Sequence, residues 1–125
     1  MKKIVSTTNA PAAIGPYSQA VKAGDFIFIS GQLPINPADG TMPENVKDQT
    51  RQSLENVLAI LASEGLDMSA VIRAGVFLDN MNDFGAMNEV YAEYFKEDCP
   101  ARAAGEVAKL PKAALVEIEA VAYCK

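Results

Sequence analysis

Two glutamates near the end of the chain are spaced so that both could act on one substrate. Glu117 and Glu119 lie two positions apart in a segment that alternates strictly between apolar and polar residues, so on a β-strand they share one face. Paired carboxylates can divide acid and base roles or hold a water molecule for attack. On composition alone, two glutamates on a solvated strand face are the simpler interpretation.

Arg102 is a cation that could complement such carboxylates. It follows Pro100-Ala101 and comes just before a predicted strand. A guanidinium can grip a carboxylate through two parallel hydrogen bonds. An arginine in such a place is more often a surface charge, so a functional role needs support from other residues.

Four further residues could line a binding cleft, and each also has a structural explanation. Tyr17 follows a Gly-Pro turn that would fix the direction of its ring, although a packing role is the simpler interpretation. Ser30-Gly31 ends an apolar segment, where the glycine could serve only a turn. Asn88 lies on a predicted helix, and a contact within the fold would explain it equally well.

The chain contains no histidine, which excludes several common catalytic arrangements. Ser-His-Asp and Cys-His nucleophile activation, HExxH zinc sites and histidine acid–base pairs all require that residue. Catalysis must therefore use carboxylates, Tyr, Lys, Arg, backbone groups and water. No metal-ligand cluster is visible in the sequence, so we expect neither a metal nor another cofactor.

Length, charge and cysteine content predict one acidic cytoplasmic domain over residues 1–125. Half of the residues are hydrophobic and 22% are charged, which is an ordinary globular balance. The net charge of −5 and the scattered cations argue against a nucleic-acid partner. No apolar stretch approaches the roughly 18 residues of a membrane helix, and no signal peptide is visible. Cys99 and Cys124 suggest no disulfide framework.

Apolar periodicity and turn residues predict the element order βββαβαββ. We expect strands at residues 5–8, 19–21, 26–30, 71–78, 104–109 and 115–123, and helices at 45–64 and 82–95. Two helices on one face of a mostly antiparallel sheet define an α+β domain.

Local signals mark the ends of several elements. The first helix has an apolar stripe at i, i+3, i+4 and i+7, formed by Leu54, Val57, Leu58 and Leu61. Gly65 is placed to end this helix, and Asn82 is placed to cap the second one. The last two strands are expected to form a hairpin that turns at Pro111-Lys112.

Apolar side chains on both faces of the 71–78 strand indicate that the face without helices is covered. By simple alternation Val71 and Phe77 point one way, whereas Ile72, Val76 and Leu78 point the other way. Two helices can cover only one face of the sheet. Another subunit is the economical cover, so the pattern predicts an oligomer.

Taken together, these segments resemble the RidA (YjgF-type) family over essentially the whole chain. The resemblance rests on NAPAAIGPYS at 9–18, SGQLP at 30–34, NEVY at 88–91, PAR at 100–102, EVAKLPK at 106–112 and VEIEA at 116–120. It implies a chorismate-mutase-like fold assembled as a homotrimeric barrel, with a cleft at each subunit interface. The implied activity is metal-independent hydrolysis of enamine and imine intermediates (2-aminoacrylate, 2-iminopropanoate, 2-iminobutanoate) to 2-keto acids and ammonia.

The resemblance also implies roles for individual residues. Arg102 would grip the substrate carboxylate, and Glu117 would position and polarise the attacking water. The cleft would be lined by Tyr17, Ser30, Gly31, Asn88 and Ala104. At that last position this chain departs from the family, because Pro-Ala-Arg is usually followed by Ser-Cys-Val and here by Ala103-Ala104-Gly105. Alanine can serve if the position contributes mainly backbone groups.

The predicted hairpin separates the two residues expected to act on the substrate. In its register Arg102 pairs near Ala122 and Glu117 near Val107, which places them roughly 16 Å apart along the ladder. A three-carbon iminoacid is too small to bridge that gap. We therefore expect each site to combine Arg102 of one subunit with Glu117 of its neighbour.

Two other functions remain open from the sequence. The same family includes proteins described as ribonucleases or translation inhibitors. A non-catalytic module that binds a small carboxylate and regulates a partner would fit the same cleft. Release of ammonia from a freshly generated iminoacid separates either alternative from the deaminase.

Overall fold

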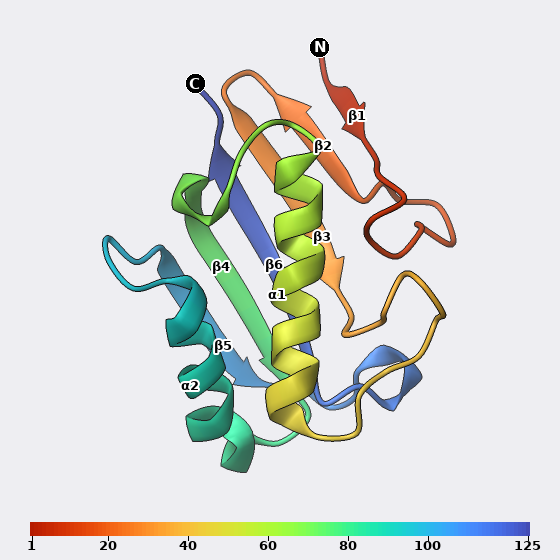
Figure 1. The fold of residues 1–125 in the computed structure, drawn as a ribbon, viewed down its shortest axis with the longest axis vertical. Helices are drawn as coiled ribbons and strands as arrows, with labels where there is room; N and C mark the ends of the chain where they lie inside the picture. The colour runs from red at the N-terminus through yellow and green to blue at the C-terminus, as the bar shows by residue number, and fades with distance from the viewer.

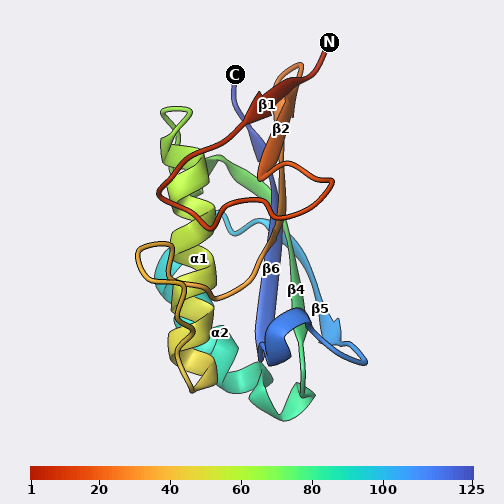
Figure 2. The same ribbon diagram turned by 90° about the vertical axis from the view of Figure 1, so that its right-hand side faces the viewer.

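Alternating apolar residues build a six-stranded sheet, and two helices cover one of its faces (Figures 1 and 2). The computed structural model describes all 125 residues. The elements are β1 (Lys3–Val5), β2 (Ala20–Ala23), β3 (Phe26–Gln32), α1 (Val46–Ala62), β4 (Val71–Leu78), α2 (Phe84–Tyr94), β5 (Ala101–Glu106) and β6 (Val116–Tyr123). Three short 3₁₀ turns cover Met68–Ala70, Met81–Asp83 and Pro111–Ala113. The predicted order βββαβαββ is confirmed, although the first strand lies at 3–5 rather than 5–8. The strand predicted at 104–109 lies at 101–106, so Arg102 is within it and not before it.

The strand order is β1-β2-β3-β6-β4-β5, and it contradicts the predicted final hairpin. Strand β6 runs antiparallel between β3 and β4, whereas β5 pairs in parallel with β4 at the sheet edge. Arg102 is therefore opposite Ala74, and Glu117 is opposite Phe77. The other strand pairs are antiparallel.

Burial explains why β6 is central and β5 is at the edge. The apolar residues of β6 are almost completely buried, namely Val116, Ile118, Ala120 and Ala122. The sequence of β5, Ala-Arg-Ala-Ala-Gly-Glu, offers little apolar area to bury, so it loses less at an edge. Because α2 connects β4 to β5, the two strands can pair in parallel through an ordinary crossover.

The first helix begins and ends close to the predicted residues. Asn45 caps it, and its side chain accepts a hydrogen bond from the Asp48 amide at 2.9 Å. Gly65 follows the helix with a φ of +73°, a conformation that glycine adopts without strain. The predicted cap of the second helix is wrong, because Asn82 lies within a 3₁₀ turn that Asn80 caps, and α2 begins only at Phe84. The Asn80 side chain accepts a 2.8 Å hydrogen bond from the Asn82 amide, whereas the side chain of Asp83, which directly precedes α2, makes no cap contact.

A bulge in β4 changes which of its residues face the helices. The register between β4 and β6 shifts at Val71 and Arg73, so Val71 is buried in the core and Ile72 is 44% exposed. Simple alternation predicted that Val71 shares a face with Phe77 and that Ile72 shares the other face with Val76 and Leu78. The structure reverses both placements, so this part of the prediction is wrong. The face without helices still carries exposed aromatic side chains, namely Phe26, Phe28 and Tyr123. None of the helices is both long and apolar enough to span a bilayer.

Candidate functional site

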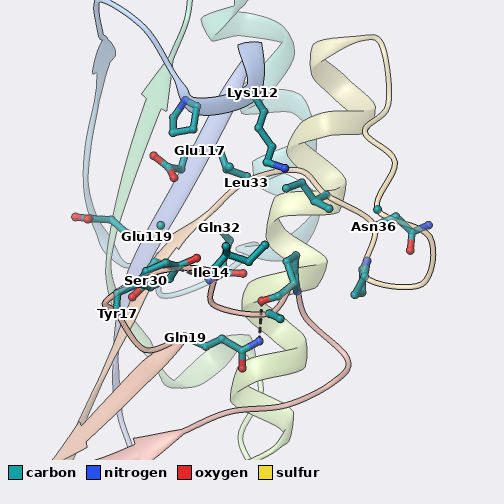
Figure 3. Close-up of a pocket in the computed structure, with 17 residues that line it drawn as sticks. Ile14, Tyr17, Gln19, Ser30, Gln32, Leu33, Asn36, Lys112, Glu117 and Glu119 are labelled. Atoms are coloured by element: carbon teal, nitrogen blue, oxygen red, sulfur yellow. Dashed lines mark hydrogen bonds between the residues drawn. The ribbon is translucent and has the colours of Figure 1, made fainter.

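A cleft of about 900 Å³ opens between the loop that precedes β2, the end of β3 and the start of β6 (Figure 3). Four of the residues expected at the site line this cleft: Tyr17, Ser30, Gly31 and Glu117. It also has polar side chains that the sequence did not single out as site residues, namely Gln19, Gln32, Asn36 and Lys112. The second glutamate of β6, Glu119, lines it as well.

Glu117 lies against Gly31, and this contact requires glycine. A Cβ atom added at Gly31 would lie 2.8 Å from both Cδ and Oε2 of Glu117. Partial burial raises the pKa of the Glu117 carboxyl, and the charge of Glu119 raises it further. A carboxylate with a raised pKa is a better proton acceptor near neutral pH.

An irregularity in β3 creates the floor of the cleft. Between Ile29 and Gln32 the register against β6 shifts, since three steps on β3 match two steps on β6. Ser30 lies in this bulge, and its hydroxyl donates a 2.6 Å hydrogen bond to the Ser18 carbonyl. The Ser30 amide donates to the Gln19 carbonyl at 2.9 Å. The bulge therefore joins β3 to the loop that carries Tyr17.

The wall formed by residues 7–19 is held by one buried glutamine. The Gln19 amide donates hydrogen bonds to the carbonyls of Thr7, Ala10 and Pro11, and its oxygen accepts one from the Thr7 amide. Tyr17 follows the turn at Gly15 and remains 53% exposed. This role of Gln19 could not be predicted, because glutamine is usually a surface residue.

Helix α1 holds the opposite wall of the cleft with two buried amide side chains. Asn56 donates hydrogen bonds to the carbonyls of Leu33 and Ile35, both of which line the cleft. Gln49 donates to the Pro43 carbonyl and accepts from the Leu115 amide at 2.8 Å. Leu115 directly precedes β6, so this contact fixes where the strand that carries Glu117 begins.

Arg102 lies outside the cleft, against helix α2. Its guanidinium donates a 2.6 Å hydrogen bond to the side-chain oxygen of Asn88. The guanidinium carbon also lies 4.7 Å from the centre of the Tyr91 ring and 5.4 Å from that of Phe84. Asn88 therefore contacts Arg102 directly. The two aromatic residues were missed at the sequence level, although Phe84, Asn88 and Tyr91 have the i, i+4, i+7 spacing of one helix face.

Within one chain, Arg102 and Glu117 lie on opposite faces of the sheet. Arg102 contacts α2, one of the two helices that cover one face (Figure 2). Glu117 alternates with Val116 and Ile118, which are buried in the core under the helices, so its side chain leaves the other face. Arg102 and Glu117 are also two strands and three residues apart, which places their Cα atoms roughly 14 Å apart. This separation replaces the one expected from the hairpin, and a small substrate cannot touch both groups of one chain.

Ala104 also lies outside the cleft. It is opposite Val76 on β4 and packs against the core. Together with Gly75 and Gly105 it lines a shallower hollow of about 300 Å³ between β4 and β5. A Cβ atom added at Gly105 would meet no heavy atom within 4 Å. The glycine at this departure from the family pattern therefore leaves open space beside the strand.

The fold and these residues define a small α+β protein of one known family. The family model described as endoribonuclease L-PSP matches residues 7–124. The chain belongs to this family, which also carries the names YjgF and RidA.

Two relatives and one solved structure match nearly the whole chain. A RutC family protein of Pyrococcus horikoshii is 58% identical over 124 residues, or 98% of each chain. The mouse protein named 2-iminobutanoate/2-iminopropanoate deaminase is 49% identical over 98% of this chain and 91% of its own length. The crystal structure of Escherichia coli TdcF with bound serine superposes with a TM-score of 0.95 at 46% identity, over 98% of this chain and 99% of that one.

Proposed function

We propose that this protein hydrolyses 2-iminoacids and their enamine tautomers to 2-keto acids and ammonia, at a site completed by two subunits. The observation that carries the proposal is the arrangement of Glu117, a carboxylate with a raised pKa in a cleft that it shares with a tyrosine and a bulged serine. The name of the mouse relative supports the choice of 2-iminopropanoate and 2-iminobutanoate as substrates.

The proposed chemistry needs few groups, because imines hydrolyse unaided in water. An enamine such as 2-aminoacrylate first takes a proton at its methylene carbon and becomes the protonated imine. Glu117 accepts a proton from a water molecule while the oxygen of that water bonds to the imine carbon, which gives a neutral carbinolamine. Glu117 returns this proton to the carbinolamine nitrogen. The C–N bond then breaks, ammonia leaves, and Glu117 accepts the hydroxyl proton as the C=O bond of the 2-keto acid forms; this proton finally passes to the ammonia or to solvent. Positioning the water beside the imine carbon accounts for most of the expected acceleration.

Arg102 of a neighbouring subunit is the proposed anchor for the substrate carboxylate. Asn88 and the rings of Phe84 and Tyr91 hold its guanidinium against helix α2, beside the edge strand β5. A neighbour docked on the face without helices would bring this edge toward the cleft. We propose a homotrimer, in which the exposed rings of Phe26 and Phe28 would be covered.

Lys112 offers a different anchor within the same chain. It is the only lysine or arginine that lines the cleft. Its backbone has a φ of 57°, an unusual conformation for a residue other than glycine. If Lys112 bound the carboxylate, one subunit would suffice. Replacing each cation in turn distinguishes the two arrangements.

A coupled assay tests the proposal. Iminoacids would be generated in place by an amino-acid oxidase, and release of ammonia would be followed with native protein, Arg102→Ala and Lys112→Ala. We expect Arg102→Ala to lose at least tenfold in kcat/KM, since a charge-assisted pair is removed. Arg51→Ala, which breaks a surface ion pair with Glu93 instead, is the matched control and should keep full activity. Native protein that does not accelerate ammonia release would refute the deaminase.

The endoribonuclease in the family description is the second candidate. The absence of histidine and the net charge of −5 argue against it. We expect any RNA cleavage to fall away during purification. Cleavage that persists and is abolished by Glu117→Gln would favour the ribonuclease.

A further inference from the structure

The second glutamate of β6 has no part in the proposed chemistry, yet its position is as closely defined as that of Glu117. Glu119 lies over Gly75 of β4, where an added Cβ atom would be 2.8 Å from Oε2 and 2.9 Å from Cγ. Glu117 lies over Gly31 of β3 in the same manner. The two carboxylates therefore leave the same face of β6, and Glu117 contacts β3 whereas Glu119 contacts β4.

The two glutamates differ in their ion pairs, because only Glu119 forms one within the chain. Arg73 Nη1 lies 3.4 Å from Oε2 of Glu119, and both side chains are about half exposed. Glu117 makes no ion pair in the chain. The Cα atoms of the two glutamates are roughly 7 Å apart, because they are two residues apart on one strand. A like charge nearby disfavours ionisation of its neighbour, and the charge of Glu119 raises the pKa of the Glu117 carboxyl.

We propose that Glu119 is a positioning residue for the deamination, whose fixed negative charge keeps the Glu117 carboxylate a strong proton acceptor while Arg73 and Gly75 set how strongly that charge acts. The inference rests on the proposed function, in which Glu117 accepts the proton of the attacking water. The direction agrees with the raised pKa of Glu117, for which burial is the larger cause and the charge of Glu119 the smaller one.

Two other groups that can carry charge line this part of the cleft: Lys112, from the 3₁₀ turn before β6, and Tyr17, from the N-terminal loop. Arg73 of β4 pairs with Glu119 but lines the neighbouring hollow between β4 and β5 instead. The two cations favour the ionised form of Glu117, and Glu119 opposes it. Helices α1 and α2 contribute no charge here, because they cover the other face of the sheet.

The experiment is a titration of the Glu117 carboxyl by ¹³C NMR in the assembled protein. Glu119→Gln should move its midpoint to lower pH, and Arg73→Gln should move it to higher pH, since the opposing charge is lost. Glu119→Asp keeps the charge and should titrate close to the native protein. Glu44→Gln removes one exposed carboxylate that makes no ion pair, and it should leave the midpoint unchanged.

The acid limb of the kcat/KM profile should shift in the same direction as the Glu117 midpoint in each variant. On that limb, kcat/KM of Glu119→Gln, divided by the maximum value of the same variant, should be roughly threefold higher than for the native protein. An unchanged Glu117 midpoint in Glu119→Gln would overturn the inference, as would an Asp variant that titrates like the Gln variant. Because the titration is read without substrate, its failure is distinct from failure of the deaminase, which native protein would show as absent ammonia release.

Discussion

The cleft around Glu117 and the edge around Arg102 are both arranged before any substrate binds, but in different ways. The cleft is a cavity with a floor of bulged strand, and a missing side chain at Gly31 makes room for its carboxylate. The edge has a cation held by Asn88 and two rings, with no comparable cavity around it. The cleft half presents a carboxylate and the edge half presents a cation, and within one chain the sheet lies between them. The cleft is therefore suited to activating a water molecule and the edge to binding a carboxylate, and within one chain these two groups cannot act on the same small substrate.

The largest expected effect is at the carboxylate of the cleft. Glu117→Gln keeps the shape of the side chain and removes its ability to accept a proton. We expect kcat to fall by about a hundredfold or more, within the usual range for loss of a general base. Glu44→Gln is the matched control on the surface. Near-native kcat in Glu117→Gln would show that the cleft supplies only binding.

The contact between Gly31 and Glu117 gives a second test of the cleft. In Gly31→Ala the new methyl group would lie within 3 Å of the carboxylate, so Glu117 must move away. We expect roughly a tenfold loss of kcat/KM, because a displacement of about 1 Å can cost that much or more. Gly105→Ala introduces the same methyl group into open space. Equal losses of kcat/KM in the two variants would mean that a change in the strand backbone, and not displacement of the Glu117 carboxylate, causes the loss.

The edge half is tested through the ring beneath Arg102. Tyr91→Leu removes one ring from the guanidinium and should raise KM severalfold, since a cation–π contact contributes about 0.5–2 kcal/mol. Tyr91→Phe keeps the ring and removes only a buried hydroxyl that has no hydrogen-bond partner, so it should retain the native KM. A change in kcat with constant KM would place Tyr91 in the chemical step instead.

The sequence predicted the cleft half better than the edge half, and the reason is physical. The alternation in residues 116–122 defines which face Glu117 takes, because burial of Val116 and Ile118 leaves one choice. Arg102 lies on a strand with little apolar area, so nothing local determines its pairing partner or its face. The hairpin prediction was wrong for that reason. The β4 bulge was also invisible, since one extra residue reverses the faces without changing composition.

A smaller expected effect is on stability, and its pH dependence should differ between a substitution in the cleft and one at the edge. The pKa of Glu117 is raised in the folded protein by burial and by Glu119, so ionising this group in the folded state costs stability above that pKa. Glu117→Gln should therefore increase the free energy of unfolding near neutral pH. The difference should shrink as pH falls through the native pKa and vanish below the unfolded one. Urea unfolding at several pH values measures this difference. Arg102→Gln leaves the Glu117 carboxyl in place, so the stability difference between this variant and the native protein should not change in this way with pH.

The central claim is that Arg102 and Glu117 of different subunits form one site, and mixing two inactive variants tests it most directly. Arg102→Ala and Glu117→Gln would each be assayed alone, then mixed in equal amounts and allowed to exchange subunits, with exchange verified by native mass spectrometry. In a cyclic assembly with random exchange, about one quarter of the sites would contain both intact residues. We predict recovery of about that fraction of native activity. Verified exchange without any recovery would contradict the shared site and place both functions within one chain.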